Sequence, residues 1–296
     1  MTNRVQLSVL GIFVLVIVSL WLTFGDIADN EQDDAQYHDR QVELVYVEWA
    51  SEIASTYVVK VVLEQLGYEV DVISVSAAAM WQAVASGDAD GHIAAWLPTT
   101  HAHYLNAVKE NLENLGPNLE GTKIGLVVPS YVTVDSIEEL NGQIDRFDGK
   151  IIGIDPGAGL MSKTEQVMED YKLDSFKLIE GSGATMTAAL AEAIRTQEWI
   201  VVAGWTPHWK FARWQLKYLK DPKNVYGQEE YIGTVVRKGL KEEMPTVYRL
   251  LDNFYWTAAD MGQVMIMNQQ KGTTPDENAK RWVDDNPDKV KKWLSP

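Results

Sequence analysis

The chain has 296 residues, of which 46% are hydrophobic, so it is long enough for one large domain or two lobes of ordinary size. Its formal net charge is −16 and its Lys and Arg residues form no cluster, which argues against a nucleic-acid partner. It has no cysteine, which excludes disulfides, thiolate metal sites, Cys nucleophiles and a lipid-modified Cys anchor.

The first segment is apolar. Residues 5–24 (VQLSVLGIFVLVIVSLWLTF) are twenty residues without a charge, which is the length of a membrane-spanning helix. We therefore expect residues 1–25 to form a transmembrane signal-anchor helix, in preference to a cleaved signal peptide, because no small-x-small cleavage site follows. Arg4 before the span and acidic residues after it place the rest of the chain on the extracellular face of the cell membrane. Residues 26–40 are polar and acidic and predict a flexible tether.

Short apolar runs then alternate with amphipathic helices, which favours an α/β fold. The first half of this region contains predicted strands at 42–47, 70–75 and 92–95, with helices between them. The second half repeats the order, with predicted strands at 150–154, 176–179 and 200–203. Each half ends on a similar segment, HIAAWLPTTH or VVAGWTPHW. Two similar α/β lobes that face each other would make a ligand cleft.

Two apolar extended runs, 123–128 (KIGLVV) and 231–236 (YIGTVV), are expected to cross between the lobes. The tail from Thr257 is predicted to be helical and to return to the first lobe. We therefore expect lobe I to comprise residues 41–128 and 232–296, and lobe II to comprise residues 129–231. Ser162 and Glu165 predict a capping box at the start of a helix in the second half.

Eleven tryptophans are many for this length, and most are interpreted as core residues. Trp49, Trp96 and Trp205 differ because they follow directly on predicted strands, where a scaffold presents binding residues. A trimethylammonium group has no N–H to donate. The faces of aromatic rings hold such a cation at about 0.5–2 kcal/mol per contact when it is desolvated. These three residues therefore predict a site for a quaternary ammonium group.

A zwitterion such as glycine betaine also needs partners for its carboxylate. Residues 155–160 (DPGAGL) precede a predicted helix, so their backbone amides are suited to bind an anion with help from the helix dipole. His101 follows Trp96 by five residues and is a candidate hydrogen-bond donor from the other lobe.

Four motifs together resemble the substrate-binding proteins of glycine betaine/proline betaine ABC importers. They are VEWASEIAST (47–56), AAWLPTTH (94–101), GIDPGAGLMSKT (153–164) and GWTPHWKF (204–211). The resemblance covers nearly all of the chain from about residue 41. It implies a two-lobed type II periplasmic-binding-protein fold with the ligand cleft between the lobes.

The resemblance also implies roles for six residues. It implies a prism of Trp49, Trp96 and Trp205 around the quaternary ammonium group. It further implies carboxylate binding by His101 and by the backbone amides of Gly159 and Leu160. Leu160 replaces the Ile of the family pattern, which matters little because only main-chain groups are involved.

The function implied is capture of glycine betaine, and of proline betaine or a related solute, for osmoprotection. The permease and ATPase subunits would be other chains, and the membrane is reached through the N-terminal helix. No cofactor, metal or catalytic residue is expected. Choline, carnitine and dimethylsulfoniopropionate remain as alternative ligands. A hydrolase remains a distant alternative, because the phosphate-loop and nucleophile-elbow spacings are absent from the sequence.

Overall fold

A computed structural model describes residues 40–295 of the chain. The predicted anchor at 1–25 and the predicted tether, apart from Arg40, lie outside these residues. Between residues 40 and 295, no helix has the length and apolar character needed to cross a membrane.

The described residues form an α/β fold around a nine-stranded sheet of order β2-β1-β3-β9-β4-β7-β5-β6, with β8 paired to β4. The strands are β1 (Gln41–Tyr46), β2 (Glu69–Ser74), β3 (Gly91–Leu97), β4 (Leu112–Pro129), β5 (Lys150–Ile152), β6 (Lys177–Ile179), β7 (Val202–Thr206), β8 (Leu216–Tyr218) and β9 (Glu230–Arg237). Strands β1 and β3 are parallel, as are β5, β6 and β7, whereas β4 and β9 run antiparallel to their neighbours.

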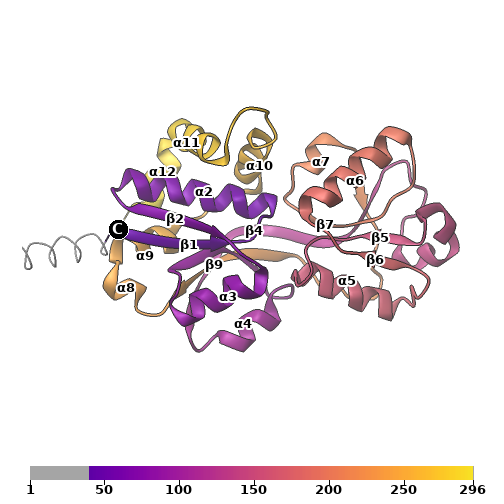
Figure 1. Ribbon diagram of the computed structural model, residues 1–296, viewed down its shortest axis with the longest axis horizontal. Helices are drawn as coiled ribbons and strands as arrows, with labels where there is room; N and C mark the ends of the chain where they lie inside the picture. Colours follow the sequence, from indigo (N-terminus) through magenta and orange to yellow (C-terminus); the bar gives the residue numbers. More distant parts are fainter. Residues whose placement is uncertain (1–39, 296) are drawn as a thin grey trace, which may run out of the picture. The chain divides into compact units, whose positions relative to one another are not determined.

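Helices cover this sheet in two groups (Figure 1). Those of the first lobe are α2 (Ala50–Gln65), α3 (Ala77–Ser86), α4 (Ala102–Val108), α8 (Leu240–Glu243), α9 (Pro245–Asn253), α10 (Ala258–Met267), α11 (Pro275–Asp285) and α12 (Pro287–Trp293). Those of the second lobe are the 3-10 helix η1 (Ile137–Phe147), α5 (Gly159–Asp170), α6 (Gly183–Thr196) and α7 (Lys210–Arg213).

Strand β4 joins the two lobes. Up to Thr122 it pairs with β9, and from Lys123 onward it pairs with β7. The predicted crossing run 123–128 is therefore the second half of a longer strand whose partners belong to the second lobe. The predicted lobe limits stay a prediction, and we propose to place the first crossing between Thr122 and Lys123.

The local signals that the sequence carries explain where several helices begin. Ser76 and Ser182 accept hydrogen bonds from Ala79 N–H and Thr185 N–H, so both cap the helices predicted after them. The predicted capping box of Ser162 and Glu165 is wrong. Helix α5 begins four residues earlier, with Ala158 as its N-cap residue, because the preceding turn already directs the chain into the helix.

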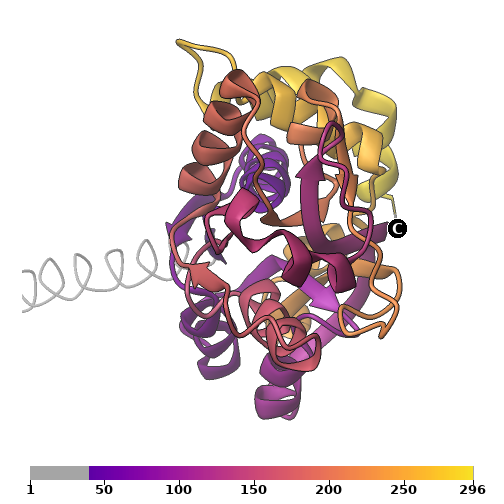
Figure 2. The same ribbon diagram turned by 90° about the vertical axis from the view of Figure 1, so that its right-hand side faces the viewer.

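The C-terminal helices return to the first lobe, as predicted. Helices α10 to α12 (yellow) lie beside α2 (indigo) in Figure 2. Lys60 of α2 forms a salt bridge with Asp276 of α11 at 2.6 Å. Trp282 and Trp293 are buried, and their rings stack with centroids 6.1 Å apart. The tail therefore closes the core of the lobe in which the chain begins.

Candidate functional site

One cavity brings the predicted site together. It contains about 300 Å3 of space not filled by atoms, part of it open to solvent. Both lobes contribute to its lining, and most of the side chains are apolar. The lining residues are Trp49, Ser51, Trp96, Thr100, His101, Ile124, Ile154, Ala158, Leu160 and Trp205.

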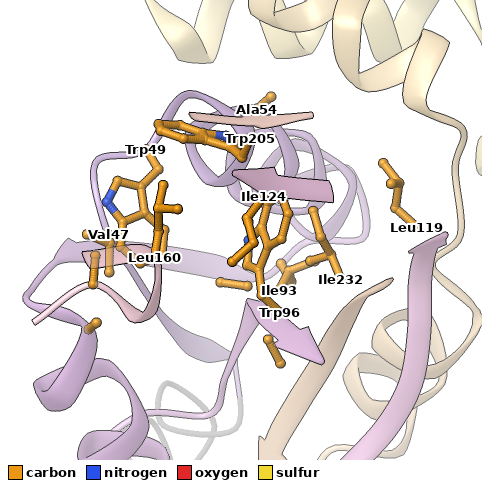
Figure 3. Packing of buried hydrophobic residues seen from close by; sticks show 14 of the residues in the cluster. Val47, Trp49, Ala54, Ile93, Trp96, Leu119, Ile124, Leu160, Trp205 and Ile232 are labelled. Carbon is orange, nitrogen blue, oxygen red and sulfur yellow. The ribbon is translucent and has the colours of Figure 1, made fainter. Parts of the chain in front are cut away.

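The three predicted tryptophans all line this cavity, and Figure 3 shows their rings with Leu160 and Ile124. We call Trp49, Trp96 and Trp205 the aromatic cage. Their exposed fractions are 6%, 4% and 3%, so little of any ring faces bulk water. Desolvated ring faces attract a cation more strongly than exposed ones. The cage can therefore hold a group that offers positive charge but no hydrogen-bond donor.

The predicted place of two cage residues needs correction. Trp96 and Trp205 were expected just beyond the ends of strands, but they lie inside β3 and β7. Trp96 pairs with Ile232 of β9, and Trp205 pairs with Ile124 of β4. Both strands continue past the cage residue because the crossing strands β4 and β9 extend the ladders beside them. The rings are thereby fixed on sheet backbone instead of on loops.

Trp49 alone lies outside a strand, as the N-cap residue of α2. Its carbonyl accepts hydrogen bonds from the N–H groups of Glu52 and Ile53. Its indole Nε1 donates a hydrogen bond at 3.0 Å to Oδ2 of Asp155, which belongs to the second lobe. This ring is therefore held from both lobes at once.

His101 lies at the cavity as a buried, neutral hydrogen-bond donor. Burial, with a smaller contribution from His103, lowers the pKa of His101 to about 3, against a weaker opposite effect of a backbone contact with Ala94. Its Nδ1 accepts a hydrogen bond from the backbone N–H of Trp96 at 3.1 Å. Because a neutral imidazole carries one proton, this assigns the proton to Nε2, which is then available as a donor.

Glu230 at the start of β9 holds the turn that carries His101. Its Oε1 accepts from the N–H groups of Thr99 and Thr100 at 2.6 and 2.7 Å, and its Oε2 accepts from the Thr100 hydroxyl. The carboxylate is buried together with this turn. It therefore fixes the backbone between Trp96 and His101.

The N-terminus of α5 enters the cavity from the second lobe. Gly159 and Leu160 are the first two residues of this twelve-residue helix, and their N–H groups have no acceptor among residues 40–295. Unpaired N–H groups at a helix start and the positive end of the helix dipole both favour an anion. Leu160 lines the cavity, whereas Gly159 packs against the first lobe. A Cβ on Gly159 would lie 2.3 Å from the Thr100 carbonyl oxygen.

Five lining residues were missed by the sequence reasoning: Ser51, Thr100, Ile124, Ile154 and Ala158. All of them except Ile124 lie within the four family motifs, so the motifs were a usable signal. The Ser51 hydroxyl is buried and has no hydrogen-bond partner among the described residues. It therefore adds a polar group to a wall that is mostly apolar.

Comparison with known proteins agrees with this geometry. Residues 40–285 match the profile of a family described as the substrate binding domain of ABC-type glycine betaine transport systems. The chain belongs to this family.

The relatives of this binding domain include proteins of known structure. It is 45% identical, with a TM-score of 0.82, to lactococcal OpuAC in a closed, liganded conformation complexed with glycine betaine, over 86% of this chain and all of that one. It is 40% identical, with a TM-score of 0.84, to the glycine/betaine/L-proline-binding protein ProX of Borrelia burgdorferi, over 86% of this chain and 97% of that one.

A curated relative is the glycine betaine/carnitine transport binding protein GbuC of Listeria monocytogenes serotype 1/2a (strain 10403S). The two are 50% identical over 161 residues, which is 54% of this chain and 52% of the relative. The match thus spans about half the length of the relative.

A buried lysine lies next to the cage of this binding domain. Lys210 Nζ is 4.3 Å from the centroid of the Trp205 ring and has no hydrogen-bond partner among the described residues. Burial lowers the pKa of Lys210 well below its usual value of 10.5, which favours the neutral amine. Lys210 does not line the cavity, so the Trp205 ring separates its amine from the ligand space.

This lysine makes stability depend on pH. In the unfolded chain Lys210 stays protonated until the pH reaches its ordinary pKa. In the folded chain burial favours the neutral amine at a lower pH, so between the two pKa values the unfolded state binds more protons. The free energy of unfolding therefore rises with pH between the folded and the unfolded pKa of Lys210. We expect Lys210→Met to raise the free energy of unfolding at pH 7, with a gain that shrinks as the pH approaches 10.

Denaturant unfolding of both proteins at pH 7 and pH 10 measures this difference. Lys217→Met serves as the control, because Lys217 is half-buried and forms a salt bridge with Asp135. A gain that is equal at the two pH values would show that Lys210 does not titrate with folding.

Proposed function

We propose that this chain is the substrate-binding subunit of an ABC importer on the outer face of the cell membrane. It captures glycine betaine between its lobes and delivers it to a permease and an ATPase on other chains. Proline betaine is expected to bind in the same way, since it also joins a methylated cation to a carboxylate. Import of such a solute protects the cell against osmotic stress.

The observation that carries the proposal is the pairing of two opposite chemistries in one cavity. The cage offers three ring faces to a cation without N–H groups. His101 and the start of α5 offer hydrogen-bond donors to an anion. Glycine betaine carries both charges on one small molecule, so it can use both sets of groups.

Binding by closure of the lobes follows from the same arrangement. Trp49, Trp96 and His101 come from the first lobe, whereas Trp205, Gly159 and Leu160 come from the second. A ligand that touches both sets favours the state in which the lobes are together. The cavity is then mostly shut off from water, which strengthens the electrostatic contacts within it.

Removal of a cage ring should weaken glycine betaine binding. We expect Trp205→Leu to raise the dissociation constant by about tenfold to thirtyfold, because one desolvated cation–π contact is lost. Isothermal titration of the full chain with glycine betaine measures the change. Trp214→Leu is the matched control, since Trp214 is half-buried and lies outside the cavity. Absence of saturable binding by the unmodified chain would refute the proposed ligand.

The role of His101 can be separated from that of the cage. We expect His101→Ala to weaken the binding of glycine betaine more than the binding of choline, because choline has no carboxylate to accept a hydrogen bond from Nε2. The ratio of the two affinities should change by about tenfold. Parallel titrations with the two ligands give this ratio. His103→Ala should leave it unchanged, since His103 does not line the cavity. An equal loss for both ligands would assign His101 to packing alone.

Closure requires Gly159 to lack a side chain. A Cβ there would lie 2.8 Å from Thr100 Cγ2 and 3.0 Å from His101 Cδ2, in addition to its clash with the Thr100 carbonyl. We expect Gly159→Ala to leave the chain folded, because these contacts join the lobes, and to lower glycine betaine affinity by at least about tenfold. Titration and the ligand-induced fall in radius of gyration by X-ray scattering test this.

Gly262→Ala is the control for this change. Gly262 also lies in a helix, but a Cβ there would meet nothing within 4 Å. Full ligand-induced compaction in the Gly159→Ala protein would contradict the steric argument.

A further inference from the structure

Within residues 40–295, Asp155 is the one residue of the second lobe that forms a hydrogen bond with a cage ring of the first lobe. Its Oδ2 accepts the Trp49 Nε1–H at 3.0 Å. Asp155 does not line the cavity and so does not face the ligand. Resting on the proposed function, we propose that Asp155 is a positioning residue that orients and polarises the Trp49 ring for cation binding when the lobes close.

The turn that carries Asp155 is itself rigid. It connects β5 to α5, and the Asp155 carbonyl accepts the N–H of Ala158 at 3.1 Å. Pro156 fixes its own φ, and Gly157 takes a φ of +86°, which a residue with a side chain rarely adopts. The same turn leads directly into Gly159 and Leu160. The carboxylate therefore moves together with the predicted anion-binding amides of the second lobe.

The bond to Trp49 has two physical consequences. It fixes the rotation of the indole ring, whose Nε1 makes no other hydrogen bond among the described residues. It also places a negative charge at the indole N–H, and hydrogen-bonded groups polarise one another in a low-dielectric site. Electron density that shifts into the ring makes its face more attractive to a cation. Orientation and attraction thus both depend on lobe closure.

Other indoles near the site lack such a partner. The Nε1 atoms of Trp81 and Trp205 are buried and have no hydrogen-bond partner among residues 40–295. Glu48 beside Trp49 is exposed. The Glu52 carboxyl is buried and, among the described residues, accepts only the Val47 N–H at 3.2 Å, and burial raises its pKa well above the usual value. The uncharged form of Glu52 is therefore favoured, and Asp155 supplies the negative charge at this edge of the cage.

A second contact between the same two segments provides a matched control. The Tyr104 hydroxyl donates to the Gly157 carbonyl at 2.6 Å, so it joins the first lobe to the same turn as Asp155 does. Tyr104 does not line the cavity and touches no cage ring at stacking distance, since its ring neighbours are Trp81, His101 and His103. Tyr104→Phe therefore removes a bond between the lobes without changing the cage.

The experiment measures glycine betaine affinity for the full chain by calorimetry in a double-mutant cycle. We expect Asp155→Ala to weaken binding by about tenfold and Asp155→Asn, which keeps an acceptor without charge, by about threefold. Tyr104→Phe should weaken binding by less than about threefold. In a Trp49→Phe background, which lacks the indole N–H, Asp155→Ala should cause little further loss. Thermal unfolding checks that each variant is folded.

The outcomes separate this inference from the proposed function. A loss from Asp155→Ala that persists undiminished in the Trp49→Phe background would overturn the inference, because Asp155 would then act by another route. Equal losses from Asp155→Ala and Tyr104→Phe would also overturn it, since closure alone would explain both. Unimpaired binding by Asp155→Ala would refute it while leaving the proposed ligand intact. Failure of the unmodified chain to bind glycine betaine would refute both.

Discussion

A methylated cation has no N–H to donate, so a binding site must attract it without hydrogen bonds, and this constraint governs the arrangement of the binding domain. Ring faces meet it, but each contributes little unless water is excluded. The chain therefore has to bury three indoles around a space that nevertheless opens to admit ligand. A cavity inside one lobe would be dry but closed, and a surface cleft would be open but wet. A cavity that is completed by two lobes is the arrangement that satisfies both demands, and Trp49, Trp96 and Trp205 are divided between the lobes accordingly.

The sheet explains how the rings are kept in place. Trp96 and Trp205 lie on β3 and β7, each beside a crossing strand, so the two rings are tied to the segments that connect the lobes. Glu230, at the first residue of β9, also binds the turn that leads to His101. The segment at which the chain re-enters the first lobe is thus bonded to the binding site itself. The residues that line the cavity are thereby tied to the strands that connect the lobes.

The sequence allowed the α/β order and the two lobes to be predicted, and five of the six predicted site residues line the cavity, because strand ends, caps and motifs are local signals. One error, the capping box at Ser162 and Glu165, was local, and the others concerned longer-range geometry. Trp96 and Trp205 were expected beyond strand ends, since nothing local showed that β4 and β9 lengthen the ladders around them. Asp155 was interpreted as a turn residue, which it is, but its bond to Trp49 joins residues 106 positions apart and has no sequence signature. The burial of Lys210 against Trp205 was equally invisible, because a lysine in a motif normally predicts an exposed charge.

The charge states of the cavity wall and of the buried groups around it connect these features to selectivity. Burial shifts the pKa values of His101, His208 and Lys210 downward and that of Glu52 upward, so each favours its uncharged form. Among the described residues that line the cavity, none has a carboxylate or an ammonium group. A sodium ion would have to give up its hydration shell without finding an anionic oxygen in the wall, which is costly. A weakly hydrated methylated cation loses much less on entry, and its own carboxylate brings the negative charge that the start of α5 and His101 can bind. Neutral walls therefore favour a ligand that carries both charges itself over either ion alone.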